Sequence, residues 1–184
     1  MNYAQLKDFL KNDFDPFWAE VVLWSKEKAP QAGVSLQEAI PLDKKTLSPS
    51  DFGFHNAIKT KDGKIVFCDF EYFGWDDPAK LTSDFLLHPA MHLSEDLKKY
   101  FVRSIQKIFS SNQDLRVRLG LVYPLFGMKW CLIFLNEFLS QGFSRRLFAN
   151  DKLDQESLFK EQLGKAQEML NRIRNTYREN PYAK

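Results

Sequence analysis

The stretch AIKTKDGKIVFCDF, residues 57–70, limits the possible folds of this chain more than any other. Two runs rich in β-forming residues flank Asp62-Gly63, and an Asp-Gly pair between such runs is a strong signal for a tight hairpin. A two-residue turn at this point would fix which residues of the two strands lie opposite each other. The chain should therefore contain one small antiparallel ribbon near the middle of the sequence.

The expected register has a chemical consequence. With a two-residue turn, Ile58 lies opposite Phe67, and Asn56 lies opposite Asp69. Residues directly opposite in an antiparallel pair point to the same face of the ribbon. We therefore expect an amide oxygen and a carboxylate side by side at the open end of the hairpin.

The sequence on either side of the hairpin is helical in pattern. Asp15-Pro16 and Asp77-Pro78 each place a capping residue before a proline, which is typical of a helix start. Residues 30–50 look irregular, and a helix is expected over 119–139. The apolar stripe of the last helix is clean: Phe159, Leu163, Ala166, Leu170, Ile173 and Tyr177. The expected fold class is mainly α with a small β-hairpin, α+β.

Composition narrows the class of protein. The chain has 184 residues, 44% of them apolar and 27% charged, which suits one globular domain. A net charge of +2 without a long basic stripe argues against a nucleic-acid partner. Cys68 and Cys131 lie in apolar runs and are expected to be buried, reduced thiols of a cytoplasmic protein. Polar residues interrupt 119–139, so we expect a buried core helix there and no membrane association.

Three polar residues around the hairpin suggest phosphoryl transfer. Asn56 and Asp69 offer two oxygen ligands, and Mg²⁺ prefers oxygen ligands completed by phosphate and water. Asp51 enters the same end of the hairpin and could accept the proton of a hydroxyl group. An Asp-x-x-x-x-Asn followed by a hairpin and a second aspartate is the order of the catalytic loop and metal strand in kinase-fold enzymes. A lone Asp-x-x-x-x-Asn is common, because these residues also form turns and caps.

At these motifs the chain resembles the aminoglycoside phosphotransferase and choline kinase-like family, which has the protein-kinase-like fold. SPSDFGFHN (48–56) is similar to the family's HGDxxxxN, and IVFCDFEYFGWDDP (65–78) is similar to its xxxxIDWExxxxGDP. The resemblance implies Asp51 as the catalytic base. It also implies Asn56 and Asp69 as ligands of Mg²⁺ bound with ATP, and Glu71 as a further candidate ligand.

The chain also departs from the family pattern. Pro49 and Ser50 replace the family's histidine and glycine before the base, and Leu81 replaces an aspartate whose structural role Asp84 could take. No Gly-x-Gly occurs, and residues 1–46 read as helix and irregular chain rather than a β lobe covering ATP. The resemblance thus implies the α-rich C-terminal lobe alone, with the N-terminal β lobe as a missing partner if the chain is a fragment.

The resulting expectation is a single domain over 1–184. Leading helices and an irregular segment span 1–46, the catalytic loop, metal hairpin and following helix span 47–88, and a helical bundle spans 89–184. The expected activity is ATP- and Mg-dependent transfer of the γ-phosphoryl group to a hydroxyl of a small molecule, aminoglycoside, choline or sugar-like. The alternative is a non-catalytic kinase-like binding module or an inactive truncated fragment, and a metal-dependent phosphohydrolase ranks last.

Other polar residues near the motifs are weaker candidates. His55, Trp75 and Asp76 are candidates for the substrate side of the site, since Trp75 and the nearby acids could favour a cationic acceptor. Each also has a structural explanation, as a loop, core or cap residue. His88 and His92 have i,i+4 spacing, but Pro89 breaks the helix that would align them, so we expect structural roles for both.

Overall fold

The computed structural model describes residues 3–140 and 154–182. The helices of the described residues are α1 (Tyr3–Phe9), a π-helical turn (Leu10–Phe14), α2 (Asp15–Gln31), α3 (Pro78–Leu87), α4 (Glu95–Ile108), α5 (Leu115–Leu135) and α7 (Gln155–Thr176). Short 3₁₀ turns occupy Leu42–Lys44, Phe54–Asn56, Pro89–Met91 and Asn136–Phe138. The strands are β1 (Thr46–Ser48), β2 (Ala57–Lys59), β3 (Ile65–Phe67) and β4 (Gly74–Asp76). Helices account for 65% of the structure, which confirms the α-rich class.

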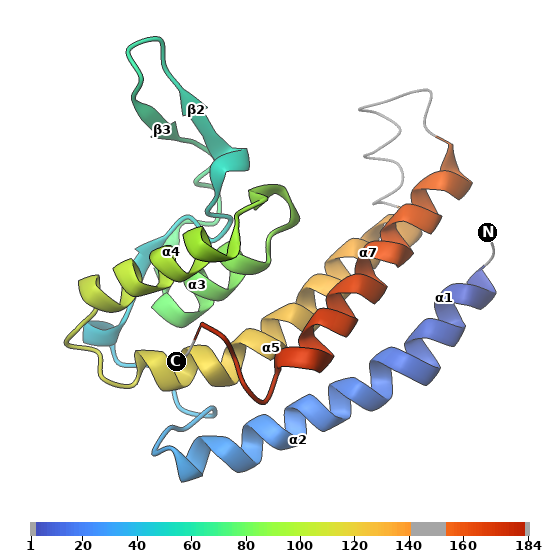
Figure 1. Cartoon of the computed structure of the whole chain (residues 1–184), viewed down its shortest axis with the longest axis horizontal. Helices are drawn as coiled ribbons and strands as arrows, with labels where there is room; N and C mark the ends of the chain where they lie inside the picture. The colour runs from blue at the N-terminus through green and yellow to red at the C-terminus, as the bar shows by residue number, and fades with distance from the viewer. Residues whose placement is uncertain (1–2, 141–153, 183–184) are drawn as a thin grey trace.

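The N-terminal helices form one nearly continuous rod (Figure 1). Asp15 does not begin a new helix: Phe14 before it is already helical, and no side chain caps α2. Pro16 lacks an N–H and cannot donate within the helix. The π turn at Leu10–Phe14 lies directly before it, as such turns do where a regular helix is interrupted. The regular α-helix α2 nevertheless begins at Asp15 with Pro16 in its first turn, as expected, whereas the predicted capping role of Asp15 is wrong. Helix α2 also runs through Pro30 to Gln31.

The capping prediction is confirmed at α3. The Ala79 N–H donates to Asp77 Oδ1 at 2.9 Å, and Pro78 occupies the first turn. An aspartate at this position satisfies an N–H that the helix itself leaves unpaired. The helix ends at Leu87, before Pro89, as expected.

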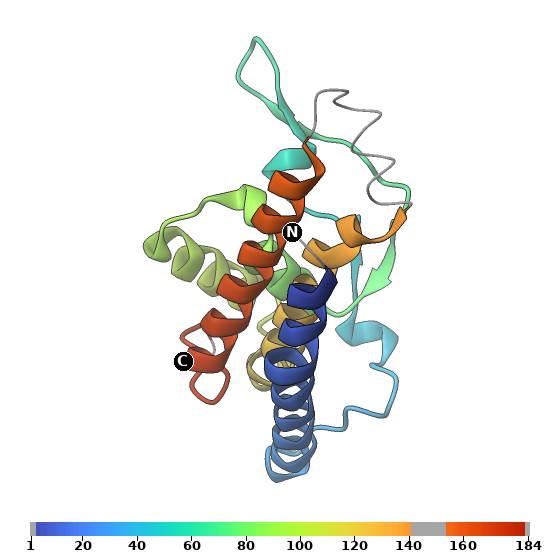
Figure 2. The ribbon, with the colours of Figure 1, turned by 90° about the vertical axis from the view of Figure 1, so that its right-hand side faces the viewer.

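Helix α5 is the centre of the molecule and packs against α2, α3 and α7 (Figures 1 and 2). Because these helices cover most of its surface, α5 is apolar on nearly all sides. All six residues of the predicted α7 stripe are buried, so that prediction is confirmed. By length and composition Leu115–Phe138 is apolar enough to cross a membrane, yet 56% of its most apolar window is buried inside the protein.

The hairpin β2–β3 exists, but its register differs from the expected one. Ile58 lies opposite Val66 rather than Phe67. The Cys68 N–H donates to the Asn56 carbonyl at 2.9 Å, so Asn56 lies opposite Cys68 and not opposite Asp69. The predicted face-to-face pair of Asn56 and Asp69 is therefore wrong.

The turn of the hairpin explains this shift. The Gly63 N–H donates to the Thr60 carbonyl at 3.0 Å, and the Thr60 N–H donates to the Lys64 carbonyl at 2.8 Å. The loop thus has three residues, Lys61, Asp62 and Gly63, with Gly63 at φ +84°. A three-residue loop that ends in a left-handed glycine is the next commonest hairpin after the two-residue type. The Thr60 hydroxyl stabilises it by donating to Asp62 Oδ1 at 2.5 Å.

A second antiparallel pair, β1–β4, has no clear signal in the sequence. Thr46 lies opposite Asp76, and Ser48 lies opposite Gly74. This pairing brings the residues before Pro49 next to the residues before α3. Residues 49–73, which include the hairpin, therefore form a loop whose two ends lie side by side. The hairpin β2–β3 lies within this loop and projects from the helical body (Figure 1).

The two cysteines differ. Cys131 is buried, and burial raises the pKa of its thiol to about 12, so it is an unreactive core thiol as expected. Cys68 is exposed, which contradicts the prediction. It lies at the end of a projecting ribbon, where an apolar run does not imply a core.

Candidate active site

A strained turn carries the chain from β1 to Asp51. The Asp51 N–H donates to the Pro49 carbonyl at 2.8 Å, and Ser50 between them has φ +67°. A γ-turn with positive φ is rare and costs energy in a residue with a side chain. The Ser50 N–H donates to the hydroxyl of buried Ser48 at 3.0 Å, which holds the turn. Strain of this kind is concentrated at functional sites.

Asn56 is bound to Asp51 through its amide nitrogen. Nδ2 of Asn56 donates to the Asp51 carbonyl at 3.0 Å and to Asp51 Oδ2 at 3.2 Å. Because only the nitrogen of an amide can donate, these contacts fix the orientation of the side chain. Within the described part of the chain, the Asn56 amide oxygen has no hydrogen-bond partner and is available to a cation.

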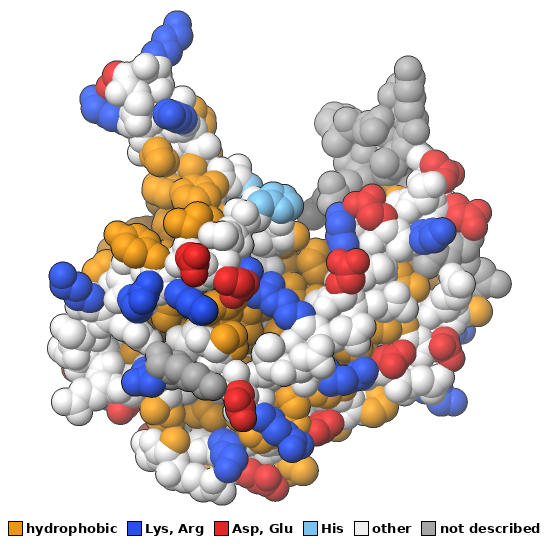
Figure 3. Space-filling view, viewed as in Figure 1, with side chains coloured by type: hydrophobic (Ala, Val, Ile, Leu, Met, Phe, Trp, Pro, Cys, Tyr) orange, Lys and Arg blue, Asp and Glu red, His pale blue; other side chains and the backbone are white. Residues whose placement is uncertain are grey.

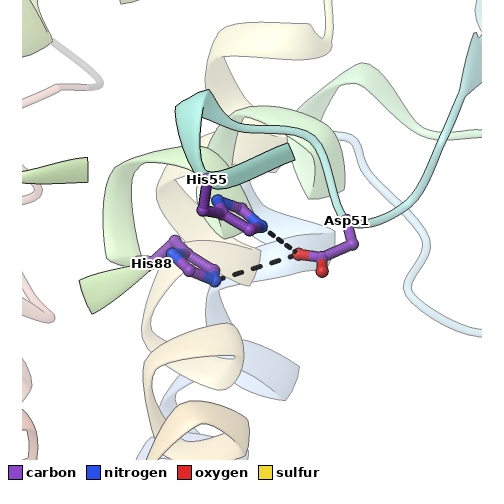
Figure 4. Close-up of side chains that lie close together, drawn as sticks. All are labelled: Asp51, His55 and His88. Carbon is purple, nitrogen blue, oxygen red and sulfur yellow. Dashed lines mark hydrogen bonds and ion pairs between the residues drawn. The ribbon is translucent and has the colours of Figure 1, made fainter. Parts of the chain in front are cut away.

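Two histidines meet Asp51 on its other oxygen (Figure 4). His55 Nε2 lies 3.0 Å from Asp51 Oδ1, and His88 Nε2 lies 3.9 Å from the same atom. The two imidazole rings are stacked, with centroids 3.8 Å apart and an interplanar angle of 2°. His55 comes from the turn at Phe54–Asn56, whereas His88 follows α3, so the site joins two distant segments.

The protonation state of His88 follows from its contacts. The Ala90 N–H donates to His88 Nδ1 at 3.1 Å, so Nδ1 carries no proton. Burial and, secondarily, the neighbouring His55 lower the pKa of His88 from 6.5 to about 4. At neutral pH the ring is therefore neutral, with its proton on Nε2 and directed toward Asp51.

This tautomer bears on metal binding. Asp51, His55 and His88 place three potential ligand atoms within 4.8 Å of one another. A metal on His88 would need the lone pair of Nε2 and a proton on Nδ1. The Ala90 N–H occupies Nδ1 and opposes that state. We therefore interpret the group as a carboxylate hydrogen-bonded by His55 and faced by the Nε2–H of His88, rather than as a metal site.

Asp51 lies at the edge of a pocket of about 380 Å³. Tyr72 and Trp130 contribute aromatic surface to its lining, and Asp84 and Lys129 contribute charge. Lys129 Nζ donates to Asp84 Oδ1 at 2.7 Å, and the indole N–H of Trp130 donates to the same oxygen at 3.2 Å. The Asp84 carboxylate is thus neutralised within the pocket wall.

Asp84 also connects to the loop that carries Asp51. Lys80 Nζ lies 3.6 Å from Asp84 Oδ2 and donates to the Ser50 hydroxyl at 3.2 Å. This route supports the expectation that Asp84 holds the loop.

The neighbouring acids are paired as well. Asp76 forms an ion pair with Lys80, and Asp77 accepts from Arg118 Nε at 3.0 Å. Trp75 is 57% exposed on β4, and the lining of the pocket does not include it. The acidic cluster therefore offers no unpaired charge to a cationic acceptor.

Asp69 and Glu71 lie just beyond β3. Asp69 has φ +64°, and Glu71 is exposed in the turn that follows. In the described residues, neither makes a hydrogen bond or ion pair with Asp51, His55 or Asn56. The left-handed backbone at Asp69 ends the regular ribbon, so alternation along the strand does not fix the direction of its side chain.

The sequence interpretation missed three residues of this site. His88 was assigned a structural role, and neither Lys129 nor Trp130 was a candidate. All three are far from Asp51 in the sequence and line the same pocket through the packing of α3 against α5. Asp84 lies in α3 and Lys129 lies in α5, so no local sequence pattern predicts that they form an ion pair.

Comparison of the chain with family models, with curated proteins and with solved structures gives no match.

Proposed function

We propose that this chain is the catalytic lobe of an ATP- and Mg-dependent phosphotransferase that acts on a hydroxyl group of a small molecule. Asp51 is the general base, and Asn56 and Asp69 are the ligands of Mg²⁺. One observation supports this assignment above the others. Asn56 uses its amide nitrogen on the base, which leaves its oxygen, a suitable ligand for a hard cation, next to Asp51.

The metal ligands are proposed from their donor chemistry. Asn56 offers an amide oxygen, and Asp69 offers a carboxylate one position beyond the residue opposite Asn56. Glu71, exposed nearby, is a candidate third ligand. Mg²⁺ held by these residues would supply electrostatic stabilisation of the charge that develops during transfer.

Asp51 is suited to act on the acceptor. Its side chain is 49% exposed, and its backbone and one carboxylate oxygen are held by Asn56. A base fixed at the edge of a pocket can accept the proton of a hydroxyl that binds there. The expected loss on replacing such a base is about 10²–10⁴-fold in turnover.

The pocket favours an uncharged acceptor. Asp51 and Asp84 are the acidic residues among the described residues that line the pocket, and Asp84 is paired with Lys129. Asp76 and Asp77, outside the lining, are also paired with basic side chains. Aromatic surface beside alternating donors and acceptors suits a sugar-like polyol better than an aminoglycoside or choline.

The first test is binding. Isothermal titration calorimetry with Mg²⁺ and a non-hydrolysable ATP analogue should show binding to the 184-residue chain, which Asn56→Leu and Asp69→Asn abolish. Asp62→Asn is the matched control, since Asp62 lies in the same hairpin at the opposite end. Equal binding by all four proteins would remove the proposed metal ligands.

The second test is turnover. Asp51→Asn should retain binding of the ATP analogue and lose phosphoryl transfer to polyol acceptors, measured as ADP release. Undiminished transfer by this variant would eliminate Asp51 as the base.

A binding module without catalysis is the second candidate. It is favoured by the apolar side chains exposed along the hairpin and the turn that follows it (Figure 3), which include Ile58, Ile65, Val66 and Phe70. A protein that fails to bind the ATP analogue in the calorimetry would support this second candidate.

A further inference from the structure

The contacts of Asp51 are divided between its two oxygens. Oδ2 accepts from the Asn56 amide, whereas Oδ1 faces Nε2 of both His55 and His88. A carboxylate contacted in this way by three side chains, two from the turn Phe54–Asn56 and one from the end of α3, has little freedom to rotate. The two histidines thus act on the oxygen that Asn56 leaves free.

His88 is itself held from several sides. The Ala90 N–H fixes its tautomer, and the edge of Trp130 packs against the ring with centroids 4.8 Å apart. Its side chain is only 15% exposed. The ring therefore has one orientation, with its Nε2 proton toward Asp51.

His55 depends on a glycine beside it. A Cβ added at Gly53 would lie 2.6 Å from two atoms of the His55 ring. Any larger residue at Gly53 would displace the imidazole from the place where it meets Asp51 and stacks on His88. The loop is built around this ring, since Gly53 has an extended backbone and is not required for a left-handed conformation.

We propose that His55 and His88 form a stacked pair of positioning residues for Asp51. His55 holds the Oδ1 oxygen by a hydrogen bond, and His88 holds the His55 ring by stacking and faces the same oxygen at 3.9 Å, so that Oδ2 is left to take the proton of the acceptor hydroxyl. This assignment rests on the proposed phosphotransferase function. As the hydroxyl oxygen bonds to phosphorus and the bond from phosphorus to ADP breaks, the hydroxyl proton moves to Asp51. Both histidines keep their own protons throughout.

Two substitutions at His88 separate this role from a purely structural one. His88→Asn keeps an acceptor near Nδ1 for the Ala90 N–H but loses the ring that stacks on His55 and the Nε2–H that faces Asp51. His88→Gln places an amide N–H near the position of Nε2 but gives up the contact with Ala90. A positioning role predicts that kcat falls about tenfold in His88→Asn, with the acceptor KM unchanged, and that His88→Gln retains most of kcat. The opposite order, with His88→Asn active and His88→Gln impaired, would overturn the proposal.

A spectroscopic measurement tests the contact without any turnover. Long-range ¹H–¹⁵N NMR spectra should show His88 in the Nε2–H tautomer at pH 7. Asp51→Ala should shift the ring resonances of His55 and His88 but not those of exposed His92, the matched control. Unshifted ring resonances in Asp51→Ala would refute the positioning pair.

The two proposals fail in different ways. In one outcome, Asp51→Ala shifts the histidine resonances, but the wild-type chain neither binds the ATP analogue nor transfers phosphate. This outcome would refute the phosphotransferase and, with it, the positioning role. Normal turnover with unshifted resonances would refute the positioning pair alone. Calorimetry with ZnCl₂ covers the metal alternative: micromolar Zn²⁺ binding that His88→Asn abolishes would make the pair metal ligands.

Discussion

At the residue scale, the site is held by strained and buried groups within a few residues of Asp51. Ser50 has a left-handed backbone, and two side chains hold it in place. Its N–H is satisfied by Ser48, and its hydroxyl accepts from Lys80. A residue with a Cβ in this conformation costs about 1–3 kcal/mol relative to an unstrained one. The surrounding contacts are what allow the turn to persist.

Replacing Ser50 with glycine should therefore stabilise the protein. We expect Ser50→Gly to raise the free energy of unfolding by about 1 kcal/mol, because glycine adopts positive φ without a steric penalty. Ser104→Gly, in the regular helix α4, is the control and should lower it by about 1 kcal/mol. Urea unfolding of the three proteins measures both changes, and a destabilised Ser50→Gly would contradict the interpretation of Ser50 as strained.

His88 should make stability depend on pH. Its pKa is about 4 in the folded protein and 6.5 unfolded, so the unfolded chain takes up a proton first as pH falls. The stability that neutral His88 contributes is fully present above pH 6.5. Between pH 6.5 and pH 4 the free energy of unfolding falls by at most about 3 kcal/mol on this account. His88→Asn removes the group that takes up this proton and keeps the neighbouring titratable groups Asp51, Asp84 and His55. Unfolding free energies between pH 7 and 4 should show the wild type losing more stability than His88→Asn, and parallel curves would disprove the assignment.

At the scale of elements, α5 and α7 pack closely at Gly127 and Ile173. A Cβ on Gly127 would lie 2.3 Å from Cδ1 of Ile173, which is fully buried. This glycine lies inside a helix, where it weakens local structure. Its presence is explained by packing, because no larger residue fits between the two helices as they lie.

Gly127→Ala should lower the free energy of unfolding by about 1–3 kcal/mol through overpacking. Gly164→Ala, in α7 with no atom within 4 Å of the new Cβ, is the matched control and should raise it by roughly 0.5–1 kcal/mol. Adding Ile173→Val to Gly127→Ala should recover part of the loss, as chemical denaturation can measure. A neutral Gly127→Ala would mean that the helices move apart at little cost.

At the scale of the whole molecule, the protein consists of a helical body with a projecting ribbon. The core includes residues of α2, α3, α5 and α7, whereas β2 and β3 bury almost nothing. Figure 3 shows apolar side chains along this ribbon, with lysines at its tip. Exposed apolar side chains that gather in one place are typical of a surface that binds a protein or another ligand.

Polar substitutions on the ribbon should leave the fold intact. Ile58→Thr and Val66→Thr, paired across the hairpin, should together change the free energy of unfolding by less than about 0.5 kcal/mol, since both side chains are half or more exposed. Urea unfolding of the variant and the wild type measures this change. Leu119→Thr in the core is the control and should cost several kcal/mol. A large loss from the ribbon variant would show that the hairpin contributes to the core.

Local features of the sequence determined much of this protein. The Asp77 cap, the α7 stripe, the presence of the hairpin and the contact between Asp51 and Asn56 all depend on residues a few positions apart, where backbone geometry alone sets the neighbours. The hairpin register was one residue from the prediction, because an Asp-Gly pair fits both a two-residue and a three-residue loop and the Thr60 hydroxyl favoured the longer one.

Only the tertiary structure decided what surrounds Asp51. The pairing of β1 with β4, the approach of His88 to His55, and the pairing of Asp84 with Lys129 each join segments that no local pattern connects. They arise because α3 packs on the central helix α5 and carries its C-terminal end toward the Asp51 loop. The sequence determined which chemical groups were present, and the packing of the helices determined which of them meet.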